Sequence, residues 1–105
     1  MEPRNFGIDH NYCINREAGD KSLKWFGKLY HDNGRFMDCF TTEPGVQVYT
    51  ANYIDNHEGL GGKKGAVYKA NAGICLETQT YPDAINCDKD IPEFAKGACY
   101  ILKKG

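Results

Sequence analysis

The strongest constraint on this chain is a two-residue alternation of apolar and polar side chains that recurs between turn sequences. Leu23, Trp25 and Leu29 share one parity and the neighbouring lysines take the other, which predicts a half-buried strand up to Tyr30. A turn sequence follows at 31–34, and a second run rich in phenylalanine and threonine covers 35–42. Two such runs around a short polar turn predict a β-hairpin.

The rest of the chain repeats this arrangement of short strands and turns. In the next strand, Val46 and Val48 take one face while Gln47 and Tyr49 take the other. Helical period is nearly absent, with 93–96 as its one short candidate. Further strands are predicted at 46–51, 67–68, 73–79 and 98–102, and loops at 56–65 and 81–92. Such a series without a linker predicts one all-β piece over 1–105, a sandwich or a barrel.

The composition is that of a globular domain and indicates few partners. Hydrophobic residues make up 41% and charged residues 26% of the 105 residues, and the net charge is −1. Runs of like charge stop at two lysines, so we expect no nucleic-acid partner and no acidic membrane surface. No apolar run is long enough to span a bilayer, and residues 1–6 lack the pattern of a signal peptide. We therefore expect a cytoplasmic location, and no feature indicates an obligate protein partner.

The cysteines argue against a secreted or metal-binding protein. Their number is odd and no two lie close together, which disfavours a disulfide scaffold. Zinc sites need paired ligands at short spacing, and the chain has no C-x-x-C sequence. The sequence therefore predicts no metal site, and free, reduced and buried thiols at Cys13, Cys39, Cys75, Cys87 and Cys99.

Three polar features and a glycine-rich loop are candidates for a functional site. Glu77 lies mid-strand, where a carboxylate either faces solvent, the reading that spacing alone slightly favours, or serves as a general base in a pocket. Gln47 has the donors and the acceptor that suit sugar hydroxyls, and Asp9–His10–Asn11 is typical of a turn. The loop at 59–65 lacks the spacing and the following helix of a phosphate-binding loop, so we interpret it as solvated.

Taken together and in order, four stretches of the chain resemble the aldose 1-epimerase family. They follow the order and spacing of that family's C-terminal portion and span most of residues 7–86. The resemblance implies a large antiparallel β-sandwich of the galactose mutarotase type, incomplete here, with the sugar site on a concave face. The four stretches are Gly7–Tyr12, Thr41–Asn52, Gly65–Tyr68 and Gly73–Gln79, the last followed by Tyr81–Asn86.

The resemblance also implies an activity and roles for three residues. The family interconverts the α and β anomers of free hexoses such as galactose and glucose, and it uses no metal or organic cofactor. Glu77 matches the catalytic base, which takes the proton from the anomeric hydroxyl while an acid protonates the ring oxygen. Asp9 matches an aspartate that hydrogen-bonds sugar hydroxyls, and Gln47 matches a glutamine that lines the sugar pocket.

The chain departs from the family at the catalytic acid. That acid is a histidine upstream of the Asp-His-Asn motif, and none of His10, His31 and His57 matches it. We therefore expect a C-terminal segment of an aldose 1-epimerase domain, without the upstream part and the last strand, and inactive by itself. Three alternatives stay open: a non-catalytic carbohydrate-binding module of the same fold, a structural β domain without sugar handling, and an epimerase of phosphorylated sugars. The lack of an arginine cluster disfavours the last of these.

Overall fold

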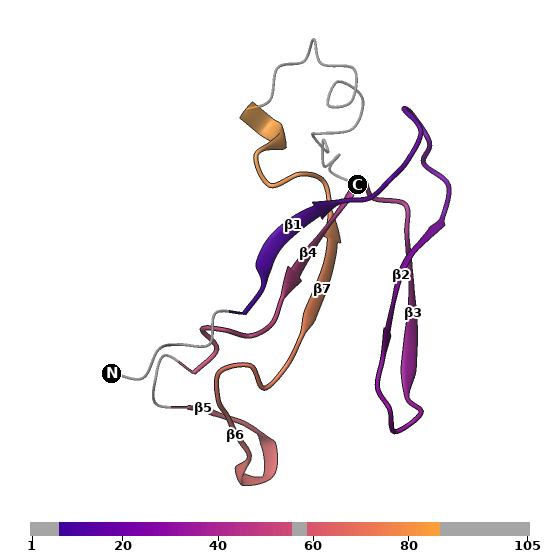
Figure 1. The fold of residues 1–105 in the computed structure, drawn as a ribbon. Helices are drawn as coiled ribbons and strands as arrows, with labels where there is room; N and C mark the ends of the chain where they lie inside the picture. Colours follow the sequence, from indigo (N-terminus) through magenta and orange to yellow (C-terminus); the bar gives the residue numbers. More distant parts are fainter. Residues whose placement is uncertain (1–6, 56–58, 87–105) are drawn as a thin grey trace, which may run out of the picture. The chain divides into compact units, whose positions relative to one another are not determined.

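The structure is a computed structural model that describes residues 7–55 and 59–86. This part contains strands and 3₁₀ turns but no α-helix, which confirms the all-β prediction (Figure 1). The strand expected at 98–102 and the helix candidate at 93–96 lie outside the described residues. The strands are β1 (Asp9–Cys13), β2 (Lys24–Tyr30), β3 (Phe36–Thr41), β4 (Gly45–Tyr49), β5 (Leu60–Gly61), β6 (Val67–Tyr68) and β7 (Cys75–Gln79), and the 3₁₀ turns are η1 (Lys63–Gly65) and η2 (Ala84–Asn86).

The strands form one three-stranded sheet and two hairpins. The sheet has the order β1-β4-β7, and the hairpins pair β2 with β3 and β5 with β6. The described residues fall into two compact units, the first made of 7–12, 47–55 and 59–77 and the second of 13–46 and 78–86. Asp9, Gln47 and Glu77, the three residues to which the resemblance gives roles, all belong to the first unit.

Strand β1 contains the Asp9–His10–Asn11 triplet, so the prediction of a turn there is wrong. Backbone hydrogen bonds hold both ends of this segment: Thr50 N donates to Ile8 O at 2.9 Å, and Ile14 N donates to Pro44 O at 2.8 Å. β1 runs antiparallel to β4, and β4 runs antiparallel to β7 (Figure 1). Because a neighbouring strand pairs its backbone, the triplet stays extended and its side chains are not used to close a turn.

Strands β2 and β3 form the antiparallel hairpin that the sequence predicted, with Tyr30 opposite Phe36 at its closed end. The turn between them is held by a hydrogen bond from His31 N to Arg35 O at 3.0 Å. Gly34 takes a φ of 90°, a left-handed conformation that glycine adopts at little steric cost. The predicted turn at 31–34 is therefore confirmed.

A β-bulge between Trp25 and Gly27 changes which side chains of β2 share a face. Strict alternation placed Trp25 on the face opposite Lys24 and Lys28; this holds for Lys24, but for Lys28 the prediction is wrong. The Trp25 Nε1 donates to Asp38 Oδ1 at 3.1 Å, and the Lys28 Nζ lies 3.4 Å from the same oxygen. The inserted residue shifts the parity of the strand by one, so Trp25 joins Lys28 on one face. There Trp25 is 52% exposed rather than half-buried.

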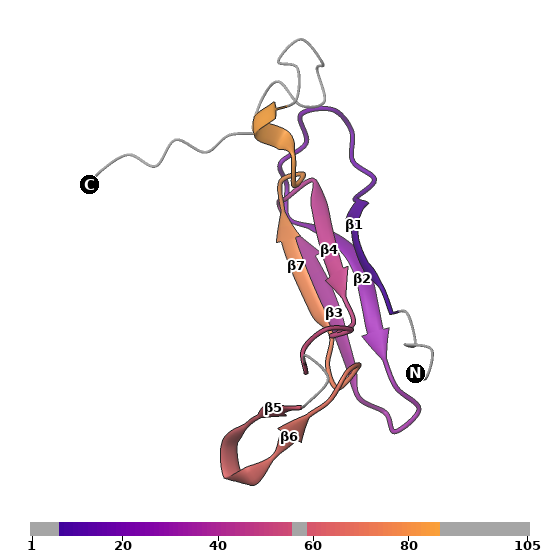
Figure 2. The ribbon, with the colours of Figure 1, turned by 90° about the vertical axis from the view of Figure 1, so that its left-hand side faces the viewer.

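Strands β5 and β6 form a small hairpin (Figure 2). β6 confirms the strand predicted at 67–68, whereas β5 lies inside 59–65, the loop interpreted as solvated. Most of its residues are exposed, as expected, but two residues of each strand pair. Gly62 lies against the ring of Tyr68, where an added Cβ would come within 2.3 Å of Tyr68 Cε2. The glycine therefore permits the close approach of an aromatic ring.

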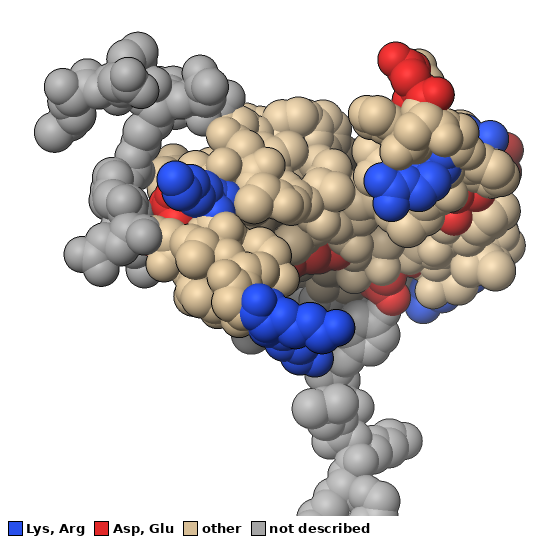
Figure 3. Space-filling view, turned by 90° about the horizontal axis from the view of Figure 1, so that it is seen from below, with Lys and Arg blue, Asp and Glu red and all other residues tan. Residues whose placement is uncertain are grey.

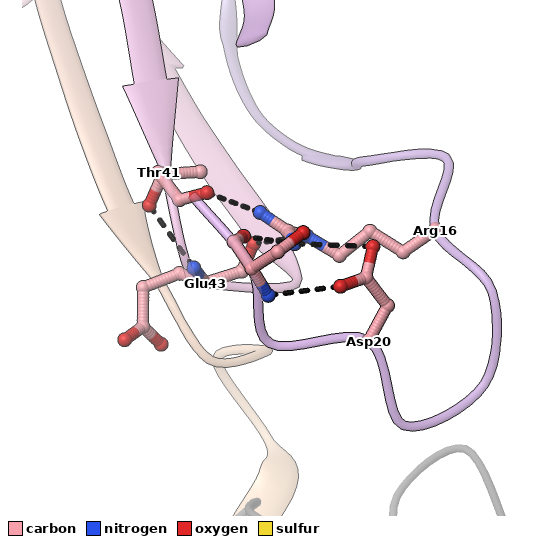
Figure 4. Close-up of polar contacts among 5 residues, drawn as sticks. Arg16, Asp20, Thr41 and Glu43 are labelled. Atoms are coloured by element: carbon pink, nitrogen blue, oxygen red, sulfur yellow. Dashed lines mark hydrogen bonds and ion pairs between the residues drawn. The ribbon is translucent and has the colours of Figure 1, made fainter. Parts of the chain in front are cut away.

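Arg16 organises the loop between β1 and β2 (Figure 4). Its guanidinium donates to the backbone carbonyls of Thr41, Glu43 at 3.1 Å and Ser22 at 2.8 Å. The side chain is only 7% exposed, and it also lies 3.9 Å from the carboxylate of Asp20. Because one planar group satisfies three carbonyls, it ties the loop to the end of β3.

Asp20 is a carboxylate whose pKa lies below its ordinary value of 3.8. Hydrogen bonds from Ser22, first from its side chain and then from its backbone N–H, are the main cause. The Ser22 N–H lies 2.8 Å from Asp20 Oδ1, and the positive charges of Arg16 and Lys24 act in the same direction. These contacts favour the ionised form and outweigh the opposing effect of burial.

The buried part of the described residues is small. It consists of Gly45, Val46 and Ala51 from the segment around β4, together with Thr41 at the end of β3 and Ala84 in η2. The Thr41 hydroxyl accepts a hydrogen bond from Glu43 N at 3.0 Å, so this buried polar group is satisfied. Many large apolar side chains are exposed, among them Trp25 and Tyr30 of the hairpin.

The thiols of the described residues are free, as predicted, but they are not buried. Cys13 and Cys75 are exposed and Cys39 is half-buried, so the burial expected for them is wrong. Each lies on a strand, and an apolar sequence around a thiol does not bury it when the sheet face is open. Cys87 and Cys99 lie outside the described residues.

Charged side chains are dispersed on the face seen in Figure 3. Lysine and arginine form several separate groups there, with acidic and uncharged residues between them, and no continuous basic surface covers the described atoms in this view. Within residues 7–55 and 59–86, no helix combines the length and the apolar character needed to cross a membrane.

Candidate functional site

Asp9 and Gln47 are in direct contact, although 38 residues separate them in the sequence. The Gln47 side chain on β4 donates from Nε2 to Asp9 Oδ1 on β1 at 2.8 Å. Because a carboxylate only accepts, this contact fixes the amide with its nitrogen toward Asp9. Within residues 7–55 and 59–86, the second N–H and the carbonyl oxygen of the amide, and the other oxygen of the carboxylate, have no further partner and can bind a ligand.

Glu77 lies on β7, the strand on the other side of β4 from Asp9. Its side chain is exposed, and its carboxylate makes no hydrogen bond or ion pair to any residue that the structure describes. Since neighbouring strands lie about 5 Å apart, β1 and β7 are separated by roughly 10 Å. The structure thus joins Asp9 to Gln47 and places Glu77 on the third strand of the same sheet.

The peptide unit before Asp9 is held by two side chains that the sequence analysis did not single out. Ile8 N donates to Thr50 Oγ1 at 2.8 Å, and Asn52 Nδ2 donates to Ile8 O at 3.2 Å. Thr50 Oγ1 lies 2.6 Å from Asn52 Oδ1, so the two side chains also bond to each other. Both lie inside a stretch that carries the family resemblance, and their only sequence signal is the pairing of Thr and Asn around one residue.

Tyr49 supports the turn that follows β4. Its phenol oxygen accepts a hydrogen bond from Tyr53 N at 3.0 Å, across the left-handed Ala51. The Tyr49 phenol oxygen therefore helps to close this turn. Tyr53 itself is exposed.

The described residues contain no group of three or more His, Cys, Asp or Glu side chains placed to hold a metal ion. The polar groups gathered in the first unit are instead a carboxylate paired with an amide and a second, exposed carboxylate. Such a set can bind hydroxyl groups as donor and acceptor, and the free carboxylate can accept a proton.

Comparison with known proteins assigns the family. The profile of the family described as aldose 1-epimerase matches residues 1–105, the whole chain. This chain belongs to the aldose 1-epimerase family. The resemblance seen in the four sequence stretches is therefore confirmed, and the all-β architecture agrees with it.

The related proteins include mammalian and bacterial members. Galactose mutarotase of Homo sapiens is 46% identical over 81 residues, which cover 76% of this chain and 22% of that protein. Aldose 1-epimerase of Haemophilus influenzae is 32% identical over 80 residues, again 76% of this chain and 22% of that protein. The chain therefore spans about a fifth of the length of these relatives. No solved structure matches the chain significantly.

Proposed function

We propose that this chain carries the catalytic base and the hexose-binding side chains of an aldose 1-epimerase that interconverts the α and β anomers of galactose and glucose. The observation that supports this most directly is the hydrogen bond between Asp9 and Gln47, two residues that the family resemblance matches to sugar binding in different stretches of the chain. Membership of the family supplies the reaction class, isomerisation of a free sugar.

Glu77 is the base in this proposal. Its exposed carboxylate takes the proton from the anomeric hydroxyl while an acid protonates the ring oxygen. The bond between C1 and the ring oxygen then breaks, and the open aldehyde rotates about C1–C2. Closure from the other face gives the second anomer, and the protons return to the groups that supplied them. Positioned proton transfer of this kind contributes about 10²–10⁴-fold in rate.

Asp9 and Gln47 orient the hexose. The Asp9 carboxylate accepts from a sugar hydroxyl, while the remaining N–H and the carbonyl of the Gln47 amide can donate to one hydroxyl and accept from another. Because the two side chains already bond to each other, little rotamer freedom is lost when the sugar binds. Holding the anomeric centre near a base also raises the rate, because the reacting groups are already oriented.

The 105-residue chain by itself is inactive in this proposal. A base and an acid must flank the same acetal, and none of the three histidines of the chain matches the family's acid. A chimera in which residues 7–86 replace the matching segment of human galactose mutarotase supplies the rest of the site. Polarimetry of freshly dissolved α-D-galactose then compares the chain, the chimera and buffer.

We expect the chimera to accelerate mutarotation and the chain alone to match buffer. Glu77→Gln in the chimera should lower kcat by about 10²–10⁴-fold, because the isosteric amide cannot accept the proton. Glu17→Gln, an exposed acid of the loop between β1 and β2, is the matched control and should leave kcat unchanged. Undiminished turnover by the Glu77→Gln chimera would remove Glu77 from its assigned role.

A non-catalytic carbohydrate-binding module is the second candidate. The specific observation in its favour is that the Asp9–Gln47 contact is formed by residues of this chain alone. Binding of galactose by the chain in a titration, together with a chimera that shows no turnover, would favour this alternative over the enzyme.

A further inference from the structure

The strongest unassigned feature of the first unit is a ring of hydrogen bonds around the Ile8 peptide. Ile8 O accepts from Thr50 N at 2.9 Å and from Asn52 Nδ2 at 3.2 Å, which uses both lone pairs of the carbonyl. The Thr50 hydroxyl accepts from Ile8 N at 2.8 Å. Its single proton is then best directed to Asn52 Oδ1 at 2.6 Å, rather than to Ile8 O at 3.2 Å. Every polar group of the ring is thereby satisfied.

The ring replaces an ordinary step of the β1–β4 ladder. In a regular antiparallel pair, Ile8 and Thr50 would exchange two backbone hydrogen bonds. Here Thr50 N still donates to Ile8 O, but Ile8 N donates to the threonine hydroxyl instead of the threonine carbonyl. The strand pairing thus ends on side chains, which hold the first peptide of β1 in place.

Two small residues next to the ring, Ala51 and Gly7, make this arrangement possible. Ala51, between the two ring side chains, has a left-handed φ of 56° and is 1% exposed, and its carbonyl accepts from Asn71 N at 2.9 Å. Gly7 passes directly against the ring, where an added Cβ would come within 1.9 Å of Asn52 Oδ1 and 2.2 Å of Thr50 Oγ1. A left-handed alanine is uncommon, so the surrounding contacts must hold it there.

The peptide that the ring holds is the one that leads into Asp9. Ile8 is the direct neighbour of Asp9, and Asp9 Oδ1 must meet Gln47 Nε2 at 2.8 Å. We propose that Thr50 and Asn52 are positioning residues that fix the backbone before Asp9 and so aim its carboxylate at Gln47 and at the hexose. This proposal rests on the proposed function for the hexose, but the placement of Asp9 against Gln47 can be tested without activity.

The test uses the chain itself, which has two glutamines, Gln47 and Gln79. Labelling the glutamine side chains with nitrogen-15 gives one pair of amide signals for each residue by NMR, one pair from Gln47 in contact with Asp9 and one from Gln79 on β7 as an internal control. Asp9→Asn marks where the Gln47 signal moves when the charged partner is lost. We expect Thr50→Val and Asn52→Ala each to move the Gln47 signal toward that position while the Gln79 signal stays. Thr50→Ser, which keeps the hydroxyl, should leave both signals in place.

The kinetic arm uses the same substitutions in the human chimera. Thr50→Val should raise KM for galactose about tenfold and change kcat by less than about twofold. The reason is that a misplaced Asp9 weakens its hydrogen bond to the sugar, which is made equally in the ground state and the transition state. An unmoved Gln47 signal in both Thr50→Val and Asn52→Ala overturns the positioning role. A chimera without activity contradicts the proposed function instead, and the NMR result then still decides the role of Thr50 and Asn52.

Discussion

Gln47 on β4 donates a hydrogen bond of 2.8 Å to Asp9 on β1, and this contact joins two strands that are distant in the sequence. Only Asp9 of this pair is charged. The neutral Gln47 amide can therefore donate one N–H to the carboxylate and still use its other N–H and its carbonyl oxygen to bind a sugar. The geometry depends on the residue at 47 being neutral, which leads to the first prediction.

Gln47→Glu should impair hexose binding more than the loss of one hydrogen bond would. The substitution places two carboxylates within about 3 Å, where both cannot stay ionised. In the human chimera, we expect KM for galactose at pH 7 to rise at least tenfold and to recover partly as the pH is lowered, since a shared proton restores the donor. Gln79→Glu, the same change on β7, is the control for added charge. A KM that does not depend on pH would contradict this account.

The sequence predicted the strands of this chain better than it predicted their faces. The hairpin of β2 and β3 follows from two runs of β-forming residues around a glycine turn, which are local signals. The bulge at Trp25–Gly27 carries no such signal, because it depends on how β3 pairs with β2. One inserted residue was enough to bring Trp25 beside Lys28.

The sequence identified the residues of the candidate site, but it did not predict how they contact one another. Resemblance identified Asp9, Gln47 and Glu77 one at a time. The contact between Asp9 and Gln47 depends on strands that pair across 38 residues, and the spacing in the sequence alone does not predict that pairing. Thr50 and Asn52 were missed because the link between them is a left-handed alanine, and sequence methods expect glycine or asparagine at such a position.

Arg16→Lys should destabilise the chain even though the charge is kept. The guanidinium serves three backbone carbonyls at once, and a lysine ammonium cannot reach them in the same fork geometry. We expect a loss of about 1–3 kcal/mol in the free energy of unfolding, measured in urea by the fluorescence of Trp25, the single tryptophan. Arg35→Lys, at an exposed position of the hairpin, should change it by less than about 0.5 kcal/mol. Equal losses in the two variants would show that the Arg16 contacts are not specific.

Asp20 should make the stability of the chain depend on pH in the acid range. Its pKa is lowered on folding, so its contribution is complete above the unfolded value of about 3.8 and is lost as the pH falls through the lower folded value. Asp20→Asn keeps an oxygen that can accept from Ser22 N but removes the charge. The stability difference between wild type and Asp20→Asn, from urea titrations, should be constant near neutral pH and shrink below about pH 4. A difference that grows in acid would reverse the sign assigned to this group.

Ala51 offers a test of the backbone strain between Thr50 and Asn52. Its left-handed backbone would force a β-branched side chain into a rarely allowed conformation in a buried place, so Ala51→Val should cost about 2–4 kcal/mol in unfolding free energy. Ala51→Gly should be close to neutral, within about 1 kcal/mol, because relief of the left-handed strain offsets the lost methyl contacts and the added freedom of the unfolded chain. Urea unfolding of both variants gives the two values. A large loss for glycine together with a tolerated valine would mean that the backbone at this position is not left-handed in solution, and the ring that holds Ile8 could not then form as described.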